Sequence, residues 1–532
     1  MACLPGRRSV VGGRRGLSIE RVRSIVIVGG GVAGWLAAAT LARLLKPTFC
    51  SVSLIESPLE TGGACSAIAL PSFHRLNSLL GINESDLLRR TCGVFNLGTQ
   101  FADWGRVGDR YFHTFGSIGT KLDAVPFHHY WLKLRPWNDS AIEDYSTASA
   151  AARRGRFAPP TSERTSFLSS YSYGYHFHAG LLTGYLREYA GEHGVTRIEG
   201  NVVEVHLRAQ DGFVDSLQLN DGSHIFADLY VDCAGPDGLL FQRVLSSGYE
   251  DWSQWLPCDR AVSVLCAGAR ELAPYSQAAA QRSGWSWRTP LQHYSDNGQV
   301  YSSRFTSDDA ATTRLLADLP ATALEEPRRR QWSPGRPAKF WDRNCLSLAG
   351  CGLDPLESTG LHLVQTGVTR LVTLFPVRLF SPDDIDEYNR LTTLECERIR
   401  DFLILHYKAT TRDDSPFWEY CRHMRVPDTL NAKIELFQSC GRFAMLDEEH
   451  FGEDSWLAVL LGQGIDPRDY DPLADVLNVE EAREALSRMR SMIRDGVNTM
   501  PTLRQYIERY CPSKTGLSRA GLARSDHGET SP

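Results

Sequence analysis

The chain has 532 residues, of which 42% are hydrophobic and 23% are charged, and its formal net charge is −6. This length supports a large buried core, and the composition is that of a water-soluble globular protein. The weak negative charge argues against a basic surface of the kind that attracts nucleic acid or anionic membranes. No apolar run reaches the roughly 18 residues of a membrane helix. We therefore expect neither a nucleic-acid partner nor a membrane partner.

The two ends of the chain differ in composition from its centre. Residues 1–23 carry six arginines and one acid, which predicts a disordered basic leader, with a transit peptide as an alternative. Residues 513–532 are polar and are predicted to form a disordered tail.

Cysteine and histidine usage indicates no metal site. The 13 cysteines are an odd number without any C-x-x-C pair, which predicts reduced thiols and a cytoplasmic location. We interpret His176 and His178 as packing residues, because no cysteine or carboxylate stands at ligand spacing from them.

The strongest local pattern directly follows the leader. Ser24–Val28 predicts a buried strand, a glycine-rich turn comes next, and a helix is predicted from about Val32 to Leu45. A second strand ends at Glu56, about 20 residues beyond the last glycine. Such glycines let a pyrophosphate approach the helix N-terminus, and the acid accepts hydrogen bonds from ribose hydroxyls. The predicted dinucleotide-binding residues are Gly29, Gly31, Val32, Ala33, Gly34 and Glu56.

This spacing fits FAD and NAD equally well, and two later segments favour FAD. His224–Leu240 and Cys345–Gly360 each read as a strand followed by a glycine-rich turn. The second segment adds Gly350 and Asp354 as candidate cofactor-binding residues. Three such strand ends spread along the chain suit one long, interrupted FAD module, whereas an NAD domain is usually contiguous.

The predicted organisation has two ordered parts. An FAD module is predicted over residues 24–380, with substrate-side insertions at about 105–165, and a mainly helical part over residues 381–512. Within the insertions, the polar stretch Asn138–Arg164 is predicted to be a mobile excursion.

Several motifs together resemble those of the flavin-dependent tryptophan halogenases. The most characteristic are GGGVAGW (Gly29–Trp35), GWSWRTPL (Gly284–Leu291) and LDPLESTG (Leu353–Gly360). The resemblance extends from about Ser24 to Pro501. Further similar segments are YFHTFG (Tyr111–Gly116), HHYWLK (His128–Lys133), HYKATTRDDSPFW (His406–Trp418) and SWLAVLLGQGIDPRDYDPLAD (Ser455–Asp475).

The resemblance implies an α/β fold in which a flavin monooxygenase-like FAD module is fused to a largely helical substrate module. The FAD module is expected to have a Rossmann-type βαβ start and a mixed sheet. The resemblance also implies a two-component enzyme of secondary metabolism, to which a separate flavin reductase supplies reduced FAD. In the family, reduced FAD, molecular oxygen and a halide ion, chloride or bromide, yield hypohalous acid, which travels through an internal tunnel to an aromatic substrate. A homodimer is compatible with the sequence.

The resemblance assigns roles to residues at the halide and at the reacting ring. Thr359 and Gly360 match the segment whose backbone amides hold the halide, and amides at a helix start are a natural anion site. Glu357 matches the carboxylate that takes the proton from the ring cation after electrophilic attack.

Four aromatic positions also match the family. His113 and Phe115 match the shelf that sandwiches the substrate ring. Trp285 and Trp287 match the tryptophans that keep the substrate away from the flavin.

One catalytic position departs from the family. The family has a lysine where this chain has Asn96, and the flanking matches Phe95, Gly98 and Trp104 fix the alignment. That lysine binds hypohalous acid or forms a haloamine with it, whereas an amide has no positive charge and is a very poor nucleophile. A second departure is the flavin loop, which carries a glutamate in the family and reads GGACSAIALP at Gly62–Pro71, with no acid.

Other lysines are scarce, because the chain has only seven. Lys121 and Lys133 are the two that follow the aromatic shelf, so they are the candidate replacements for the missing lysine.

Three functions remain open from the sequence. The first is a reduced-FAD-dependent oxidoreductase acting on an indole- or phenol-type substrate, with halogenation weakened or replaced by oxygenation. The second is a working tryptophan or indole halogenase that uses another donor. The third is a flavin-binding protein without turnover, which retention of Glu357, Trp285 and Trp287 disfavours.

Overall fold

The computed structural model describes most of the chain. The described residues are 21–58, 65–122, 125–137, 139–163, 166–235, 240, 248–269, 271–377 and 379–514. Most of the predicted leader, residues 59–64 with the first three positions of the flavin loop, and residues 515–532 of the tail therefore lie outside this part. The last residues of the predicted leader, which are described, pack against the fold. Val22 is fully buried, and the Arg21 guanidinium lies 4.4 Å from the centroid of the Phe49 ring.

A six-stranded sheet forms the nucleotide-binding module, in the order β20-β21-β12-β1-β2-β8. All neighbours pair in parallel except β20 and β21, which pair in antiparallel fashion. Parallel pairing brings the carboxyl ends of β1, β2, β12 and β21 to one edge, where α/β proteins bind nucleotides. The bounds are β1 Ser24–Val28, β2 Ser51–Glu56, β8 Thr196–Glu199, β12 Leu229–Asp232, β20 Trp341–Asp342 and β21 Cys345–Ser347.

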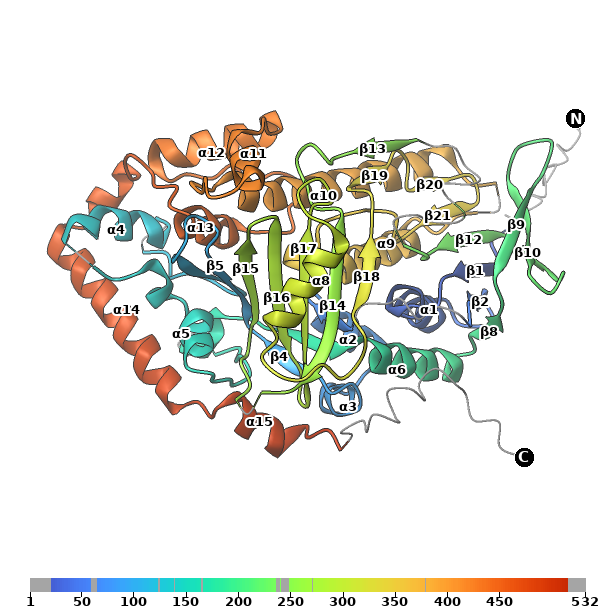
Figure 1. Cartoon of the computed structure of the whole chain (residues 1–532), viewed down its shortest axis with the longest axis horizontal. Coiled ribbons are helices and arrows are strands. Elements are labelled where there is room, and N and C mark those ends of the chain that lie inside the picture. Colours follow the sequence, from blue (N-terminus) through green and yellow to red (C-terminus); the bar gives the residue numbers. More distant parts are fainter. Residues whose placement is uncertain are drawn as a thin grey trace, which may run out of the picture.

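Helices pack beside this sheet, as Figure 1 shows for α1 and α6. α1 contacts both α6 and α9, and its central residues Ala37–Ala39 are fully buried. Small side chains at these positions allow the three helices to approach closely. The bounds are α1 Val32–Leu45, α2 Phe73–Leu80, α3 Glu84–Arg90, α6 Ala179–Glu192 and α9 Gly360–Thr373.

A seven-stranded sheet carries the other half of the module, in the order β18-β14-β17-β16-β15-β5-β6. A three-stranded sheet, β3-β7-β4, packs on it through Ser66–Asp296 and His176–Ser276 hydrogen bonds. The bounds are β3 Ser66–Ala69, β4 Val94–Asn96, β5 Gly98–Ala102, β6 Arg110–Thr114, β7 Gly174–His178, β14 Arg260–Ala267, β15 Ser276–Gln281, β16 Gly284–Pro290, β17 Tyr294–Tyr301 and β18 Arg328–Gln331.

Smaller elements complete the module. A second three-stranded sheet has the order β11-β10-β9, and β13 pairs with β19. Short 3₁₀ helices are η1 Arg135–Trp137, η2 Ile142–Tyr145, η3 Phe167–Ser170, η4 Pro355–Glu357 and η5 Pro472–Val476. The remaining bounds are β9 Val202–Leu207, β10 Val214–Leu219, β11 His224–Phe226, β13 Tyr249–Asp251, β19 Gly335–Pro337, α4 Phe127–Leu134 and α8 Asp308–Ala317.

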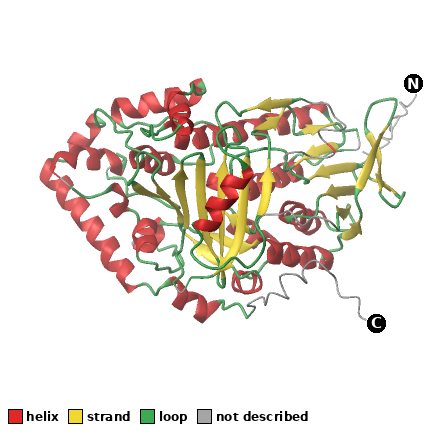
Figure 2. Cartoon of the chain, in the orientation of Figure 1, coloured by secondary structure: helices red, strands yellow, loops and turns green. Residues whose placement is uncertain are grey.

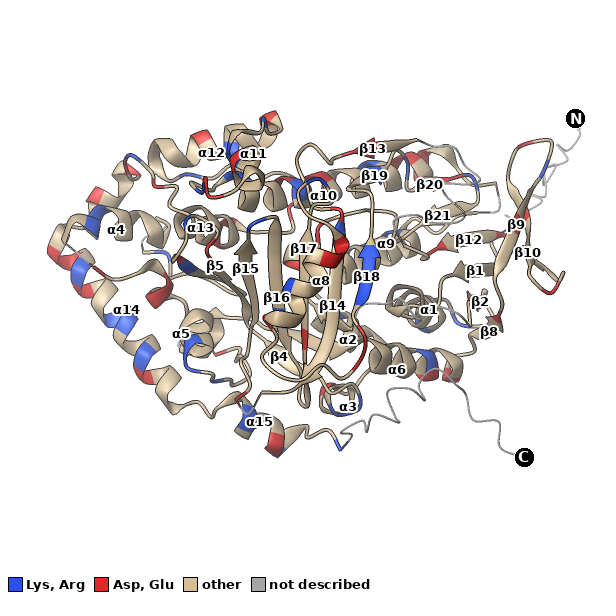
Figure 3. Cartoon of the chain, viewed as in Figure 1, with Lys and Arg blue, Asp and Glu red and all other residues tan. Residues whose placement is uncertain are grey.

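The C-terminal part is built from helices, as Figure 2 shows. α14 is amphipathic: Leu486, Ile493 and Val497 are buried, and charged residues of both signs alternate on its exposed face (Figure 3). The mixed sheets and this helical part confirm the predicted fold class. The bounds are α10 Pro382–Lys408, α11 Pro416–His423, α12 Asp428–Cys440, α13 Glu453–Gly462, α14 Val479–Thr499 and α15 Leu503–Tyr510.

The stretch Asn138–Arg164 contains packed structure instead of the expected mobile excursion. Its helix α5 (Thr147–Arg153) contacts α14 and β6, and Ala148, Ala151 and Ala152 are almost fully buried. The pattern of small and polar residues was misleading because alanine needs little room to bury against a neighbouring helix.

Candidate active site

The glycine turn after β1 forms an open cradle at the N-terminus of α1. Gly29 has φ +117°, which favours glycine, and a Cβ at Gly34 would lie 1.8 Å from the Gly29 carbonyl oxygen. A Cβ at Gly31, in contrast, would meet nothing within 4 Å. The turn therefore requires a glycine at position 29, and the close packing of the helix requires one at position 34. The open space beside Gly31 and the following Val32 and Ala33 fits the pyrophosphate of FAD.

Glu56 stands at the carboxyl end of β2, as predicted, and is held by the protein itself. Trp35 Nε1 donates a 2.9 Å hydrogen bond to Glu56 Oε2, and Arg187 and Arg197 pair with Oε1. The predicted ribose-binding acid is thus fixed in place by the tryptophan that follows the glycine turn. The sequence pattern did not reveal this contact.

The segment after β21 is stabilised by Asp354. Asp354 Oδ1 accepts from Leu356 N at 3.0 Å, and Oδ2 accepts from Tyr407 Oη at 2.6 Å. Burial raises the pKa of Asp354 to about 6. Gly350 packs closely, since a Cβ there would lie 2.6 Å from Ser347 Oγ. Both carboxyl oxygens of Asp354 are therefore engaged within the chain.

Glu357 lies next to a helix start that suits an anion. The 3₁₀ helix η4 ends at Glu357, its C-cap Ser358 turns the chain with a φ of 55°, and Thr359 is the N-cap of the 14-residue helix α9. A Cβ at Gly360 would meet nothing within 4 Å, so there is room in front of the helix. Backbone amides at such a terminus attract anions, which fits the predicted halide site.

Two imidazoles clamp the Glu357 carboxylate. His113 Nδ1 lies 3.0 Å from both carboxylate oxygens, and His406 Nε2 lies 2.9 Å from Oε1. The Glu357 side chain is only 4% exposed. Burial opposes its ionisation, but the attraction of His113 and His406 outweighs burial and lowers the pKa of Glu357 to about 2. Burial lowers the pKa of His406.

On the side of His406 that faces away from Glu357, buried hydrogen bonds extend the clamp. His406 Nδ1 lies 3.2 Å from Tyr111 Oη, and Gln463 Nε2 donates to Tyr111 Oη at 3.0 Å. Burial raises the pKa of Tyr111, which keeps the phenol protonated. Sequence reasoning missed His406, although it begins one of the motifs that resemble the family.

Aromatic rings surround the clamp. The His113 ring centroid lies 5.4 Å from that of Phe402 and 5.9 Å from that of Phe451. Phe402 stacks on Phe451 at 3.9 Å and meets Trp456 edge-on at 5.1 Å. The His113 shelf is therefore part of a larger aromatic cluster formed with α10 and α13.

Phe115 lies next to a strand, and Trp285 and Trp287, the predicted barrier between substrate and flavin, lie on one. Phe115 follows β6, and its N–H donates to the Leu97 carbonyl at 2.9 Å. Trp285 and Trp287 lie on β16 with ring centroids 5.9 Å apart. Trp287 Nε1 donates to Asp296 Oδ2 at 3.2 Å.

Asn96 is buried at the end of β4, with 2% of its surface exposed. Its Oδ1 accepts a 3.0 Å hydrogen bond from Gly98 N, the first residue of β5. In β5, Thr99 pairs with His113 on β6, so Asn96 stands three residues before the strand pair that carries the clamp. The amide oxygen of Asn96 thus stabilises the turn between two strands.

The two candidate replacement lysines lie in different settings. Lys121 is exposed. Lys133 Nζ donates to the carbonyls of Ala474 and Leu477 at 3.0 and 2.8 Å and lies 2.9 Å from Asp475, so it fastens α4 to η5.

A third lysine, which sequence reasoning set aside in favour of Lys121 and Lys133, lies at the aromatic cluster. Lys433 Nζ is 4.3 Å from the centroid of the Trp456 ring and pairs with Glu449. Both of these charged side chains are buried.

Comparison with known proteins identifies the family. The tryptophan halogenase family model matches residues 24–479. The chain belongs to the tryptophan halogenase family. Similar solved structures are the flavin-dependent halogenases Xcc4156 from Xanthomonas campestris and BrvH from Brevundimonas sp. BAL3, each 39% identical. Their TM-scores are 0.89 and 0.88, covering 93% and 92% of this chain and 100% of each other chain. Tryptophan 7-halogenase RebH from Lentzea aerocolonigenes is 27% identical over 528 residues, covering 92% of this chain and 98% of RebH.

Family membership confirms several predictions. The cofactor is FAD, a separate flavin reductase supplies it in reduced form, and oxygen and halide are the co-reactants of the family. This tryptophan halogenase family member is an FAD-dependent enzyme of a family that acts on aromatic substrates.

None of the described helices is long and apolar enough to cross a membrane. In the described part of the chain, no three His, Cys, Asp or Glu side chains are arranged to hold a metal ion.

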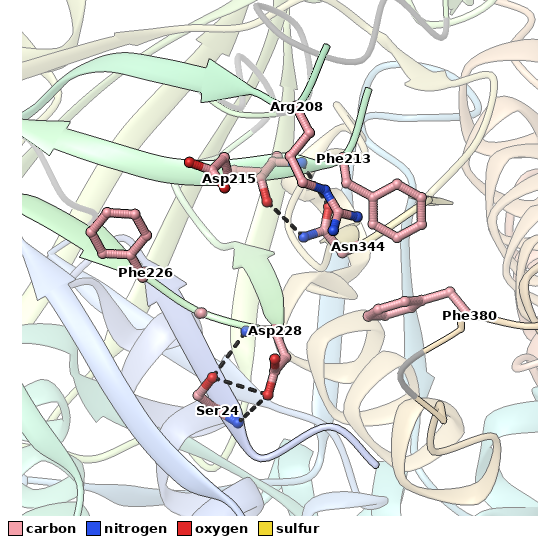
Figure 4. A pocket seen from close by; sticks show the side chains of 10 residues that line it. Ser24, Arg208, Phe213, Asp215, Phe226, Asp228, Asn344 and Phe380 are labelled. Carbon is pink, nitrogen blue, oxygen red and sulfur yellow. Dashed lines mark hydrogen bonds between the residues drawn. The ribbon is translucent and has the colours of Figure 1, made fainter. Parts of the chain in front are cut away.

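A cavity of about 300 Å³ lies at the opposite edge of the nucleotide sheet (Figure 4). It is lined by Ser24 at the amino end of β1 and by Asp228, Arg208 and Phe213. Because nucleotides bind at the carboxyl ends of parallel strands, this cavity is distinct from the cradle at Gly31.

Proposed function

We propose that this member of the tryptophan halogenase family is a reduced-FAD-dependent oxidoreductase of indole- or phenol-type substrates in which halogenation is weakened or replaced by oxygenation. The observation that carries the proposal is Asn96. Its amide is uncharged, its oxygen is engaged by Gly98 N, and an amide nitrogen is too weak a nucleophile to form a haloamine.

The residues around the reacting ring retain a proton acceptor. FAD, when bound, supplies the oxidising chemistry together with oxygen. Glu357 then accepts the proton that the attacked ring releases, and its low pKa keeps it ionised throughout the physiological range. A ring cation is a strong acid, so a carboxylate of low basicity suffices. The contacts of Glu357 with His113 and His406 hold the acceptor in one place.

The shelf and the barrier have separate tasks in this proposal. His113 and Phe115 place the substrate ring, and Trp285 and Trp287 separate it from FAD. Thr359 and Gly360 hold the halide at the start of α9. A cytoplasmic location and a homodimer stay predictions.

Product analysis tests the proposal. The protein is incubated with FAD, a flavin reductase, NADH, bromide and a panel of indoles and phenols, and products are read by mass. We expect oxygen consumption with little brominated product, and a mass gain of one oxygen atom on the accepted substrate. Efficient bromination of any panel member by the wild type would contradict the proposal.

The second candidate is a working halogenase with another donor, and the position of Lys433 beside Trp456 favours it. If Lys433 has taken over the missing role, Lys433→Met should abolish brominated product, while the matched variant Lys121→Met in an exposed position should not. The intact clamp on Glu357 disfavours a protein without turnover, because such a protein gains nothing from two imidazoles on a buried carboxylate.

A further inference from the structure

Asp296 is a buried carboxyl group for which the proposed reaction has no role. It lies on β17, opposite Thr289 on β16 and Leu265 on β14, and is 2% exposed. Carboxyl groups are rarely buried this deeply without a partner of opposite charge. Its surroundings therefore require an explanation.

Two donors from different sheets meet on one oxygen of Asp296. Ser66 Oγ on β3 donates to Oδ2 at 2.5 Å, and Trp287 Nε1 on β16 donates to the same atom at 3.2 Å. The other oxygen, Oδ1, is buried and has no hydrogen-bond partner in the described part of the chain. The carboxyl group thus joins the small sheet to the large one through Oδ2 alone.

The indole of Trp287 reaches Asp296 because Gly298 leaves room for it. Trp287 is paired with Gly298 in the sheet, and a Cβ on Gly298 would lie 2.1 Å from Trp287 Cζ2. The ring therefore lies across Gly298, and its N–H is directed along β17 to Asp296, two residues away. Rotation of this ring would break its hydrogen bond to Asp296.

Ser66 lies within the flavin loop, Gly62–Pro71. It begins β3, and β3 shares a three-stranded sheet with the β4 strand that ends at Asn96. A contact between Ser66 and Trp287 through Asp296 therefore links the loop side of the site to the tryptophan barrier.

We propose that Asp296 is a positioning residue that fastens the indole of Trp287 to the β3 end of the flavin loop, so that barrier and loop keep one relative arrangement. The role rests on the proposed function, which places Trp287 between FAD and substrate. The flavin loop, Gly62–Pro71, contains no acid of its own, and the buried Asp296 contacts its Ser66 from the opposite sheet.

The electrostatic setting supports this role. Burial raises the pKa of Asp296 to about 6, hydrogen bonds from Ser66 and Trp287 act against that rise, and the charge of Glu325 adds to it. Oδ2 can accept both hydrogen bonds in either protonation state, so the link does not depend on ionisation.

A double-mutant cycle tests the proposal. Ser66→Ala and Trp287→Phe are made singly and together, in the wild type and in the Asp296→Leu background, and the FAD dissociation constant is measured for each by flavin fluorescence. We expect the two substitutions to be non-additive in the wild type, by about five-fold in the dissociation constant, and additive and nearly silent in Asp296→Leu. Equal, additive effects in both backgrounds would overturn the proposal.

Further variants and a second signal keep the test decisive. Asp296→Asn keeps an oxygen acceptor at the same place and should retain most of the coupling, even if Asp296→Leu unfolds. Asp309→Asn, a carboxylate exposed on α8, is the matched control and should leave the cycle unchanged.

The NMR chemical shift of the Trp287 indole ¹⁵N–H gives a second readout. It should change in Ser66→Ala only while residue 296 is a hydrogen-bond acceptor, and a chemical shift that responds to neither substitution would also overturn the proposal. Neither FAD affinity nor the Trp287 signal requires turnover, so this proposal can be tested even if the oxygenation assay fails.

Discussion

Two buried carboxyl groups, one assigned to the proposed reaction and one outside it, behave in opposite ways. Glu357 and Asp296 are 5% and 2% exposed, so both lose nearly all contact with water. Two imidazoles face Glu357, and its pKa falls to about 2. Burial raises the pKa of Asp296 to about 6 and the charge of Glu325 adds to the rise, whereas the hydrogen bonds from the Ser66 hydroxyl and the Trp287 indole N–H oppose it. Burial alone therefore does not decide the state of a carboxyl group; the charges of its neighbours do.

The difference separates two kinds of work. Glu357 is an ionised carboxylate held by imidazoles, so it is ready to accept a proton from the substrate. Asp296 is held by neutral donors, so it suits a fixed structural link. Each of the following substitutions alters one of these two carboxyl groups or its surroundings.

The largest effect is expected from Glu357→Gln. An amide cannot accept the ring proton, so product formation should fall by about 10²–10⁴-fold. FAD affinity should stay the same, because Glu357 is not part of the cradle at Gly31. Product yield by mass and FAD binding by fluorescence are measured together, and loss of both would show that Glu357 stabilises the fold and does not act on the substrate.

A smaller effect is expected from His406→Phe, which removes one imidazole from Glu357. Without this attraction, burial raises the pKa of Glu357 towards its ordinary value or above it. The acid limb of the pH–rate profile should therefore move to higher pH, and the maximal rate should fall by about ten-fold. Tyr111→Phe, which removes only the group behind His406, is the matched control and should shift the limb less. An unmoved acid limb in His406→Phe would contradict the clamp.

The smallest effect is expected in the pH dependence of stability. The folded pKa of Glu357 lies below its ordinary value, so its contribution is present above about pH 4.5 and is lost as pH falls through about 2. The folded pKa of Asp296 lies above its ordinary value of 3.8, so its contribution is present below that pH and is lost as pH rises through about 6.

Asp296→Asn should therefore gain stability relative to the wild type between pH 5 and pH 8, by about 1.4 kcal/mol. Urea unfolding at both pH values measures the difference in the free energy of unfolding. The surface variant Asp309→Asn should show none. A constant difference between Asp296→Asn and the wild type would contradict the raised pKa.

Local patterns predicted much of this molecule. The β1–α1–β2 unit follows from a strand, a glycine turn and an acid that lie within one short stretch, and the position of Glu357 beside the start of α9 follows from a continuous motif. The helical C-terminal part follows from periodicity alone.

The missed contacts all join distant parts of the chain. Ser66 and Asp296 are 230 residues apart, and Tyr111 and His406 are 295 residues apart. Strand register and helix packing bring such side chains together, and neither leaves a mark at one place in the sequence. Lys433 was set aside for the same reason, since its neighbour Trp456 belongs to a different helix.

Asn96→Lys tests the central claim most directly. A lysine at this position would place an ammonium at the end of β4, just before the strand pair that carries His113, and would free Gly98 N from the Asn96 side chain. With reduced FAD, oxygen and bromide, the wild type should consume oxygen but yield little brominated product, and Asn96→Lys should raise the brominated product while Glu357 is intact. The flavin loop without an acid limits the gain, so a modest rise supports the account. Efficient bromination by the wild type together with a silent Asn96→Ala would contradict it, and Lys433 would then be the donor to test.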